Sequence, residues 1–415
     1  MSDRIRPQLW PAVAPLFIVA MVLFVFTIVV GILNGMDVYS PDHDTLMTHV
    51  HAGTLGFITL SVAGTAMLVF TEGRELSEHL VGRAKVLAWT LAAAIGLYVL
   101  AFFAGDRIPG DRIQRPIVGS LLFIVVLWFG WWLFKQNKGY DRSSVVRLGL
   151  GLSWVSLIVG ATLGVLLGIF SARGEVPGLG NDAAAALADA HPPSMVIGFL
   201  VLAAVSITEW LIRDPKPFRE DRWGVAQMLV TFTAGILVII ALVGSIDPLL
   251  GPANMMELFS VGILVVRLRH QLMPDGWKGA GVSVYGRVSI LFLIADLVVL
   301  TYLVSQVISE AMDFDALTDA QFGLILTLDH LMFVGVMAIA LFGVMAKGAH
   351  PDGLTTVDKI VLWGVTIGIT GFAIGLLTVT PEIKRMATPV LGLALLIGIG
   401  SYVVELAKAS SLPRT

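Results

Sequence analysis

The chain has 415 residues, of which 56% are hydrophobic and 14% are charged, and its mean hydropathy is +0.86. This composition excludes an ordinary soluble protein and is typical of a polytopic membrane protein. The absence of cysteine excludes disulfides, thiolate metal sites, iron–sulfur clusters and covalently attached c-type haem. The net charge of −3 does not identify a partner; we expect the lipid bilayer to surround the chain, and no nucleic acid to bind.

Apolar stretches of about 20 residues, the length needed to cross a bilayer, recur along the whole chain. The first runs from Trp10 to Leu33, which is too long for a cleaved signal peptide, so we predict a retained span. The predicted spans are 10–34, 46–70, 85–104, 116–134, 148–170, 192–212, 224–246, 252–268, 287–308, 320–346, 357–380 and 388–407. The expected fold class is therefore an all-α polytopic membrane protein with twelve transmembrane helices.

The distribution of basic residues predicts the orientation of these spans. If the N-terminus is cytoplasmic, all but six of the 27 lysine and arginine residues fall in inner segments. The six in outer segments are Arg107, Arg112, Arg115, Arg173, Lys384 and Arg385. We therefore expect a multi-pass protein with both termini in the cytoplasm.

The chain repeats itself with a period near 137 residues. Pro116, Pro252 and Pro389 each stand at the predicted start of a helix, separated by 136 and 137 residues. We predict one membrane domain over 1–415, built of three pseudo-repeats of four helices at about 1–140, 141–278 and 279–415.

Two histidines, His49 and His51, stand one residue apart at the start of the second span. Ionisable side chains at membrane depth are costly unless they bind or pair with something. Positions i and i+2 of a helix point about 200° apart. The two histidines should therefore face two different neighbours.

Histidines on the sixth and tenth spans are the natural partners. His49 and His191 lie seven residues before Gly56 and Gly198, whereas His330 lies five residues before Gly335, as His51 does before Gly56. Interhelical hydrogen bonding is the simple explanation for one such residue. Four histidines at one depth in the membrane instead favour ligation of haem iron, or of copper or zinc.

The sequence leaves the ligand arrangement open. It allows two bis-histidine pairs, or one pair and a site with an open coordination position, and it does not show which of His49 and His51 belongs to His191.

Further charged residues are secondary candidates. Asp296 lies in the middle of the ninth span, where it is either a proton-relay group or a partner of Ser289 or Thr301. Asp329 precedes His330 and either anchors a ligand or forms an interhelical hydrogen bond. Haem propionates would emerge on the outer face, where the ion-pairing candidates are Arg107, Arg112 and Arg115.

The segment His49–Phe57, HVHAGTLGF, resembles the H-V-H-x-G-x-L-G-W/F motif of the catalytic subunit of cbb-type haem–copper oxidases. In that family the first histidine ligates the high-spin haem and the second the low-spin haem. The NnrS-type membrane proteins, linked to nitric oxide resistance, have the same H-x-H-x-x-x-x-G-F spacing on the second span. The resemblance implies twelve helices with pseudo-threefold symmetry and a centre lined by the second, sixth and tenth helices. It also implies that the protein is located in the bacterial cytoplasmic (inner) membrane.

This chain departs from the oxidase pattern at the copper site. The oxidases carry the H-x-H pair on the tenth helix, and their copper site needs a histidine on the sixth helix and a His-His pair on the seventh. Here no His-His pair exists, and His191 is the only comparable residue. An oxidase-type copper centre therefore cannot be assembled.

We therefore expect an integral membrane protein of the haem–copper-oxidase-like class that binds one or two b haems, with copper possible but not favoured. The haem ligands would be His49, His51, His191 and His330. The expected role is electron transfer, or binding or reduction of a diatomic gas such as nitric oxide or oxygen, with an electron donor or further membrane subunits as partners. The rival hypotheses are a secondary transporter and a haem-free metal-binding protein.

Overall fold

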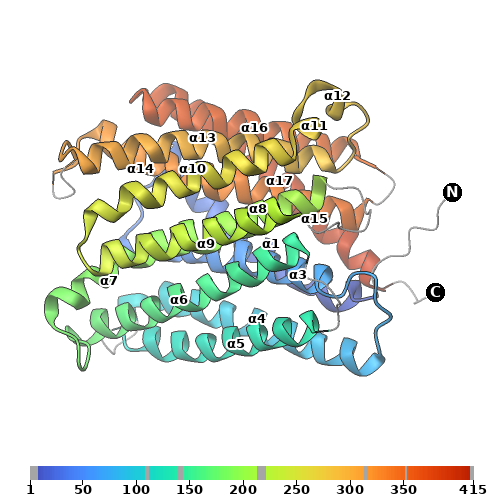
Figure 1. The fold of residues 1–415 in the computed structure, drawn as a ribbon, viewed down its shortest axis with the longest axis horizontal. Helices are drawn as coiled ribbons and strands as arrows, with labels where there is room; N and C mark the ends of the chain where they lie inside the picture. Colours follow the sequence, from blue (N-terminus) through green and yellow to red (C-terminus); the bar gives the residue numbers. More distant parts are fainter. Residues whose placement is uncertain are drawn as a thin grey trace.

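The computed structural model describes residues 8–107, 112–138, 144–212, 221–312, 316–350 and 353–411. Within these ranges it contains no strand and twelve helices that are long and apolar enough to cross a membrane. The predicted fold class, an all-α polytopic membrane protein, is confirmed. The helices run roughly side by side along the long axis of the molecule (Figure 1).

Nine of the described spans are single α-helices. They are α1 (Trp10–Gly35), α4 (Glu78–Ala104), α5 (Gln114–Asn137), α6 (Val145–Arg173), α9 (Arg222–Val243), α10 (Leu250–Arg267), α13 (Ser283–Ile308), α16 (Thr356–Leu377) and α17 (Pro381–Ser411). Short helices lie in the connections: η2 (Gly105–Arg107), η4 (Asp247–Leu249), α11 (Arg269–Leu272) and α12 (Pro274–Trp277).

The second, sixth and tenth spans are built differently, because a π-helix interrupts each of them. The second comprises α2 (His43–His51), η1 (Ala52–Thr59) and α3 (Leu60–Val69); the sixth comprises α7 (Asn181–Pro193), η3 (Ser194–Leu200) and α8 (Val201–Ile212); the tenth comprises α14 (Asp319–His330), η5 (Leu331–Ala338) and α15 (Ile339–Ala349). π-Helical turns are rare and are found frequently at functional sites.

These three spans form the centre of the bundle. Their apolar windows are 89%, 83% and 61% buried, whereas no other span exceeds 44%. The halves that follow the π-helices contain small residues, such as Ala63 and Gly64 in α3, which let neighbouring helices approach closely. The outer helices expose large apolar side chains such as Trp131 and Leu393, as a lipid-facing surface requires.

Side-chain caps determine where several helices begin. Asp42 accepts a hydrogen bond of 2.7 Å from the backbone N–H of Thr45 and starts α2, while Thr318 and Thr355 form capping boxes at α14 and α16. One predicted boundary is wrong. Pro389 does not open the twelfth span but lies inside α17, because a first-turn proline at Pro381 already starts that helix.

The two ends of the described chain lie at the same end of the bundle, together with α11 and α12, and α7 lies at the opposite end (Figure 1). The central spans therefore begin at the far end, which we call the distal end. The predicted orientation would make it the outer face.

Candidate functional site

The three π-helices occupy equivalent positions. Each begins four residues before a glycine, namely Gly56, Gly198 and Gly335. A Cβ atom added to these glycines would lie 3.0 Å from Leu23, 3.1 Å from Ser156 and 2.9 Å from Phe292, in the first, fifth and ninth spans. The same approach between neighbouring helices thus occurs three times, which supports the predicted repeat.

This alignment gives the histidines two registers. His49 and His191 lie three residues before their π-helices, whereas His51 and His330 lie one residue before theirs. The rings therefore leave the central spans at two fixed orientations at the distal end.

The structure brings the four histidines together in two pairs. The His49 imidazole lies within electrostatic range of His330, and the His51 imidazole lies within range of His191. Each pair joins one histidine of each register across an interface between two central spans. The sequence left this assignment open.

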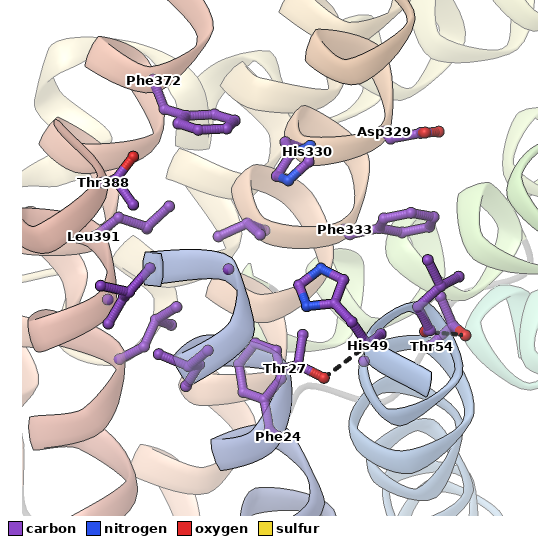
Figure 2. A pocket seen from close by; sticks show the side chains of 18 of the residues that line it. Phe24, Thr27, His49, Thr54, Asp329, His330, Phe333, Phe372, Thr388 and Leu391 are labelled. Atoms are coloured by element: carbon purple, nitrogen blue, oxygen red, sulfur yellow. Dashed lines mark hydrogen bonds between the residues drawn. The ribbon is translucent and has the colours of Figure 1, made fainter. Parts of the chain in front are cut away.

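We call the first pair site 1. Its histidines line a cavity of about 190 Å³ with largely apolar walls, between α1, α2, α14, α16 and α17. Figure 2 shows His49 and His330 entering this cavity from two different helices, with Phe24, Phe372 and Leu391 around it.

The two rings of site 1 are held unequally. Nδ1 of His330 lies 2.8 Å from the carbonyl oxygen of Leu326. Nδ1 of His49 is buried and has no hydrogen-bond partner, and only its backbone carbonyl is held, by Thr27 Oγ1 at 3.0 Å. The His49 ring thus has no hydrogen bond at Nδ1 to fix its orientation, and this nitrogen is unsatisfied.

We call the second pair site 2, and here both rings are held. Nδ1 of His51 lies 2.7 Å from the carbonyl oxygen of Met47, and Nδ1 of His191 lies 3.0 Å from that of Gly160. Phe102 stacks on the His51 ring with centroids 3.9 Å apart, and Tyr98 meets it edge-on at 5.7 Å.

These backbone contacts determine which nitrogen can act as a ligand. A carbonyl oxygen only accepts hydrogen bonds, so Nδ1 of His51, His191 and His330 must carry the proton. Nε2 then keeps its lone pair. Metal-ligating histidines are usually oriented in this way, by donating their other ring N–H to a carbonyl or carboxylate.

Two glycines that the sequence reasoning missed make room for the rings. A Cβ atom at Gly31 would lie 3.3 Å from His49 Cε1, and one at Gly164 would lie 2.8 Å from His191 Cε1. Both glycines lie eight residues after the equivalent positions Leu23 and Ser156, so comparing the first and fifth spans of the repeats could have identified them.

The three predicted arginines lie near site 2 at the distal end and already have carboxylate partners. Arg115 is buried and pairs with Asp44, Arg112 lies 3.8 Å from Asp44, and Arg107 lies 3.0 Å from Asp42. Arg115 also lies 4.7 Å above the Phe102 ring, on the residue that stacks against His51. Backbone and side-chain hydrogen bonds from Thr45, followed by the charge of Arg107, lower the pKa of Asp42.

A second basic group lies at the distal end, and the sequence reasoning placed its residues in an outer segment without naming them as site candidates. Lys384 and Arg385, at the start of α17, bind Asp37 at 2.7 and 2.8 Å. Thr388, one turn further along α17, lines the cavity of site 1. The hydrogen bonds from Lys384 and then Arg385 lower the pKa of Asp37.

The other candidates take separate places. Asp329 lines the cavity of site 1 beside His330. Asp296 pairs with neither hydroxyl suggested by the sequence, because Ser289 donates to Val336 O and Thr301 to Leu297 O. The exposed histidines His43, His79 and His270 belong to neither pair.

No known protein-family model matches the chain, and no curated protein is significantly similar to it. The geometry of the two histidine pairs is therefore the main basis for assigning a function.

Proposed function

We propose that this chain is an integral membrane haem-b protein that holds two haems, one between His49 and His330 and one between His51 and His191. The observation that carries the proposal is the pairing of imidazoles across two interfaces, with Nδ1 bound to a backbone carbonyl in three of the four rings. Haem needs only axial ligands from the protein, because the macrocycle supplies four nitrogens.

The donor set suits haem better than a bare metal ion. Among the described residues no group of three or more histidine, aspartate or glutamate side chains is placed to hold a metal. Zinc and copper sites usually need three or four protein ligands. A pair of imidazoles from two different helices is sufficient to ligate a macrocycle that brings its own four nitrogens.

The cavity of site 1 provides part of the space required. Its volume of about 190 Å³ is below the roughly 300–1,000 Å³ of typical ligand pockets. A macrocycle therefore needs rim side chains such as Phe372, 4.8 Å from the His330 ring, to move aside.

The proposed role is electron transfer, with binding of a diatomic gas such as nitric oxide or oxygen at site 1. When bound, haem supplies the redox change and the coordination position for the gas. The protein's own residues position the imidazoles, exclude water with apolar walls, and place basic side chains at the distal end. Arg107, Arg112, Arg115, Lys384 and Arg385 are the candidates there for exchanging a carboxylate partner for a haem propionate.

An absorption spectrum of the purified full-length chain, expressed with a supply of haem, tests this proposal. We expect a Soret band and sharp α and β bands on reduction. A folded but colourless protein would contradict it. The variants His330→Ala and His191→Ala should each lose part of the spectrum, while His79→Ala, at an exposed histidine, should keep all of it.

A further inference from the structure

The three central spans can meet in three pairs. Site 1 lies between the second and tenth spans and site 2 between the second and sixth, whereas the interface between the sixth and tenth contains no histidine pair. The registers that hold imidazoles at the other two interfaces hold Pro193 and Leu328 here, five residues before Gly198 and seven before Gly335. A haem at this interface would have no axial ligand from these positions.

Carboxyl groups lie in this third region instead. Asp296 on α13 interacts electrostatically with Glu257 on α10 and with Asp329 on α14. Asp296 lies four residues after Phe292, just as Thr27 lies four residues after Leu23 and Gly160 four residues after Ser156. Since Leu23, Ser156 and Phe292 are equivalent in the three repeats, so are Thr27, Gly160 and Asp296. Both of those residues hydrogen-bond to a site histidine, so Asp296 occupies a position that faces the site in each repeat.

The two central carboxyl groups are buried without a cation. Asp296 is 4% exposed and Glu257 is 2% exposed. Oδ1 of Asp296 has no hydrogen-bond partner. In the part of the chain that the structure describes, neither residue forms an ion pair with lysine or arginine. Two buried carboxylates without counter-charges are strongly unfavourable in a membrane interior.

A row of buried polar groups leads to this pair from the end of the bundle where α11 and α12 lie (Figure 1). Arg267 at the end of α10 binds Glu209 at 2.7 Å and Gln227 at 2.6 Å. Further along, Ser260 donates to the carbonyl oxygen of Gln227 and shares a hydrogen bond with Thr231. The next polar residue on the same face of α10 is Glu257, one turn beyond Ser260 and about 15 Å from Arg267 at 1.5 Å per residue.

We propose that Glu257 and Asp296, on the packed helices α10 and α13, form a proton-binding carboxyl pair beside the third interface, where the histidine registers hold no imidazole. Uptake of one proton converts one of the two carboxylates into a neutral acid and so removes one of the two buried, uncompensated charges. Adjacent carboxyl groups in a low dielectric share a proton because both cannot be ionised. The Ser260–Thr231–Gln227 row then gives protons a polar route to the pair.

The surroundings favour a proton over a metal ion. The carboxyl groups facing Asp296 are Glu257 and Asp329, and no three-ligand cluster is present among the described residues. The other elements packed against α13 are α8, η5 and α15, and their titratable groups lie elsewhere. Glu209 on α8 is paired with Arg267, and Lys347 on α15 lies 3.8 Å from the Trp210 ring.

Infrared spectroscopy of the full-length protein tests the proposal without depending on haem. We expect a carboxylic-acid C=O band near neutral pH that shifts in D₂O and is lost in both Glu257→Gln and Asp296→Asn. Glu209→Gln is the matched control, since this buried carboxyl group is paired with Arg267 instead, and the band should persist in this variant. Biosynthetic ¹³C labelling of aspartate or of glutamate shifts the band in the unmutated protein, so the test holds even if a variant fails to fold.

A wild-type spectrum without an acid band, or a band that survives in both variants and is unmoved by either label, would overturn the proposal. Loss of the band on adding sodium or calcium at neutral pH would also overturn it, because the pair would then be a cation site.

Discussion

Sites 1 and 2 each combine one histidine from each of the two registers, but they differ in how firmly they hold the imidazole rings. Site 2 anchors both imidazoles, covers one ring face with Phe102 and places the buried Arg115 beyond it. Site 1 anchors only His330, leaves Nδ1 of His49 without a partner and encloses a cavity. The difference teaches that site 2 fixes the orientation of both imidazoles by hydrogen bonds, whereas site 1 fixes only one of them.

Carbon monoxide binding to the reduced protein should show the largest difference between the sites. If haem is bound at site 1, His330 would hold it, and the gas would take the position of His49, whose ring has no hydrogen bond to a backbone carbonyl. His49→Ala should keep gas binding and His330→Ala should abolish it, as measured by the reduced-plus-CO difference spectrum. Equal loss in both variants would show that the two rings are held alike, and unchanged binding in both would place the gas elsewhere.

The ion pairs of Arg107, Arg112 and Arg115 near site 2 should matter more for stability than for ligation. Asp44→Asn leaves the buried guanidinium of Arg115 without its carboxylate, and breaking a buried ion pair costs about 3 kcal/mol of unfolding free energy. Thermal unfolding in detergent measures the effect. Asp42→Asn is the matched control, because its pair with Arg107 is exposed and asparagine also caps helices well. Equal destabilisation by both variants would contradict the claim that the buried Asp44–Arg115 pair stabilises the fold more than the exposed Asp42–Arg107 pair.

Adding one methyl group beside each site should show how tightly the rings are packed. Gly164→Ala places Cβ 2.8 Å from His191 Cε1 and should break the bond of that ring to Gly160, whereas Gly31→Ala places it 3.3 Å from the freer ring of His49. Overpacking of this kind costs about 1–3 kcal/mol. We expect a larger loss of haem and of melting temperature in the Gly164 variant.

Gly151→Ala serves as the reference, since nothing lies within 4 Å of the added Cβ. A greater loss in Gly31→Ala than in Gly164→Ala would reverse the assignment of the tighter site.

The smallest effect is expected at the basic group near site 1. Because Lys384 and Arg385 lower the pKa of Asp37, their pairing adds stability that is complete above the ordinary pKa of aspartate and is lost as the pH falls through the lowered value. Asp37→Asn should therefore lower the unfolding free energy at pH 7 by at most about 1 kcal/mol, which lowers the melting temperature slightly, and it should have no effect in strong acid. Asparagine tolerates the positive φ of 58° at this position. A difference that persists in strong acid would mean that Asp37 acts through another contact.

The amino-acid sequence was sufficient to predict twelve spans, because each apolar run is long enough to cross a bilayer. It also indicated that His49 and His51 face apart, since helix geometry requires it. It could not pair them, because the pairing depends on which central span packs beside which face. The π-helices, the stacking of Phe102 on His51 and the contact of Asp37 with α17 arise from tertiary packing and have no local sequence period. The start of α17 was misplaced because two prolines, Pro381 and Pro389, offered alternative helix starts.

The number of haems per chain tests the central claim most directly. Haem extracted from the purified full-length protein and measured as the pyridine haemochrome should give two haems b per chain, falling to one in His191→Ala and remaining at two in His79→Ala. A folded wild-type protein that takes up no haem under the same conditions would contradict the account.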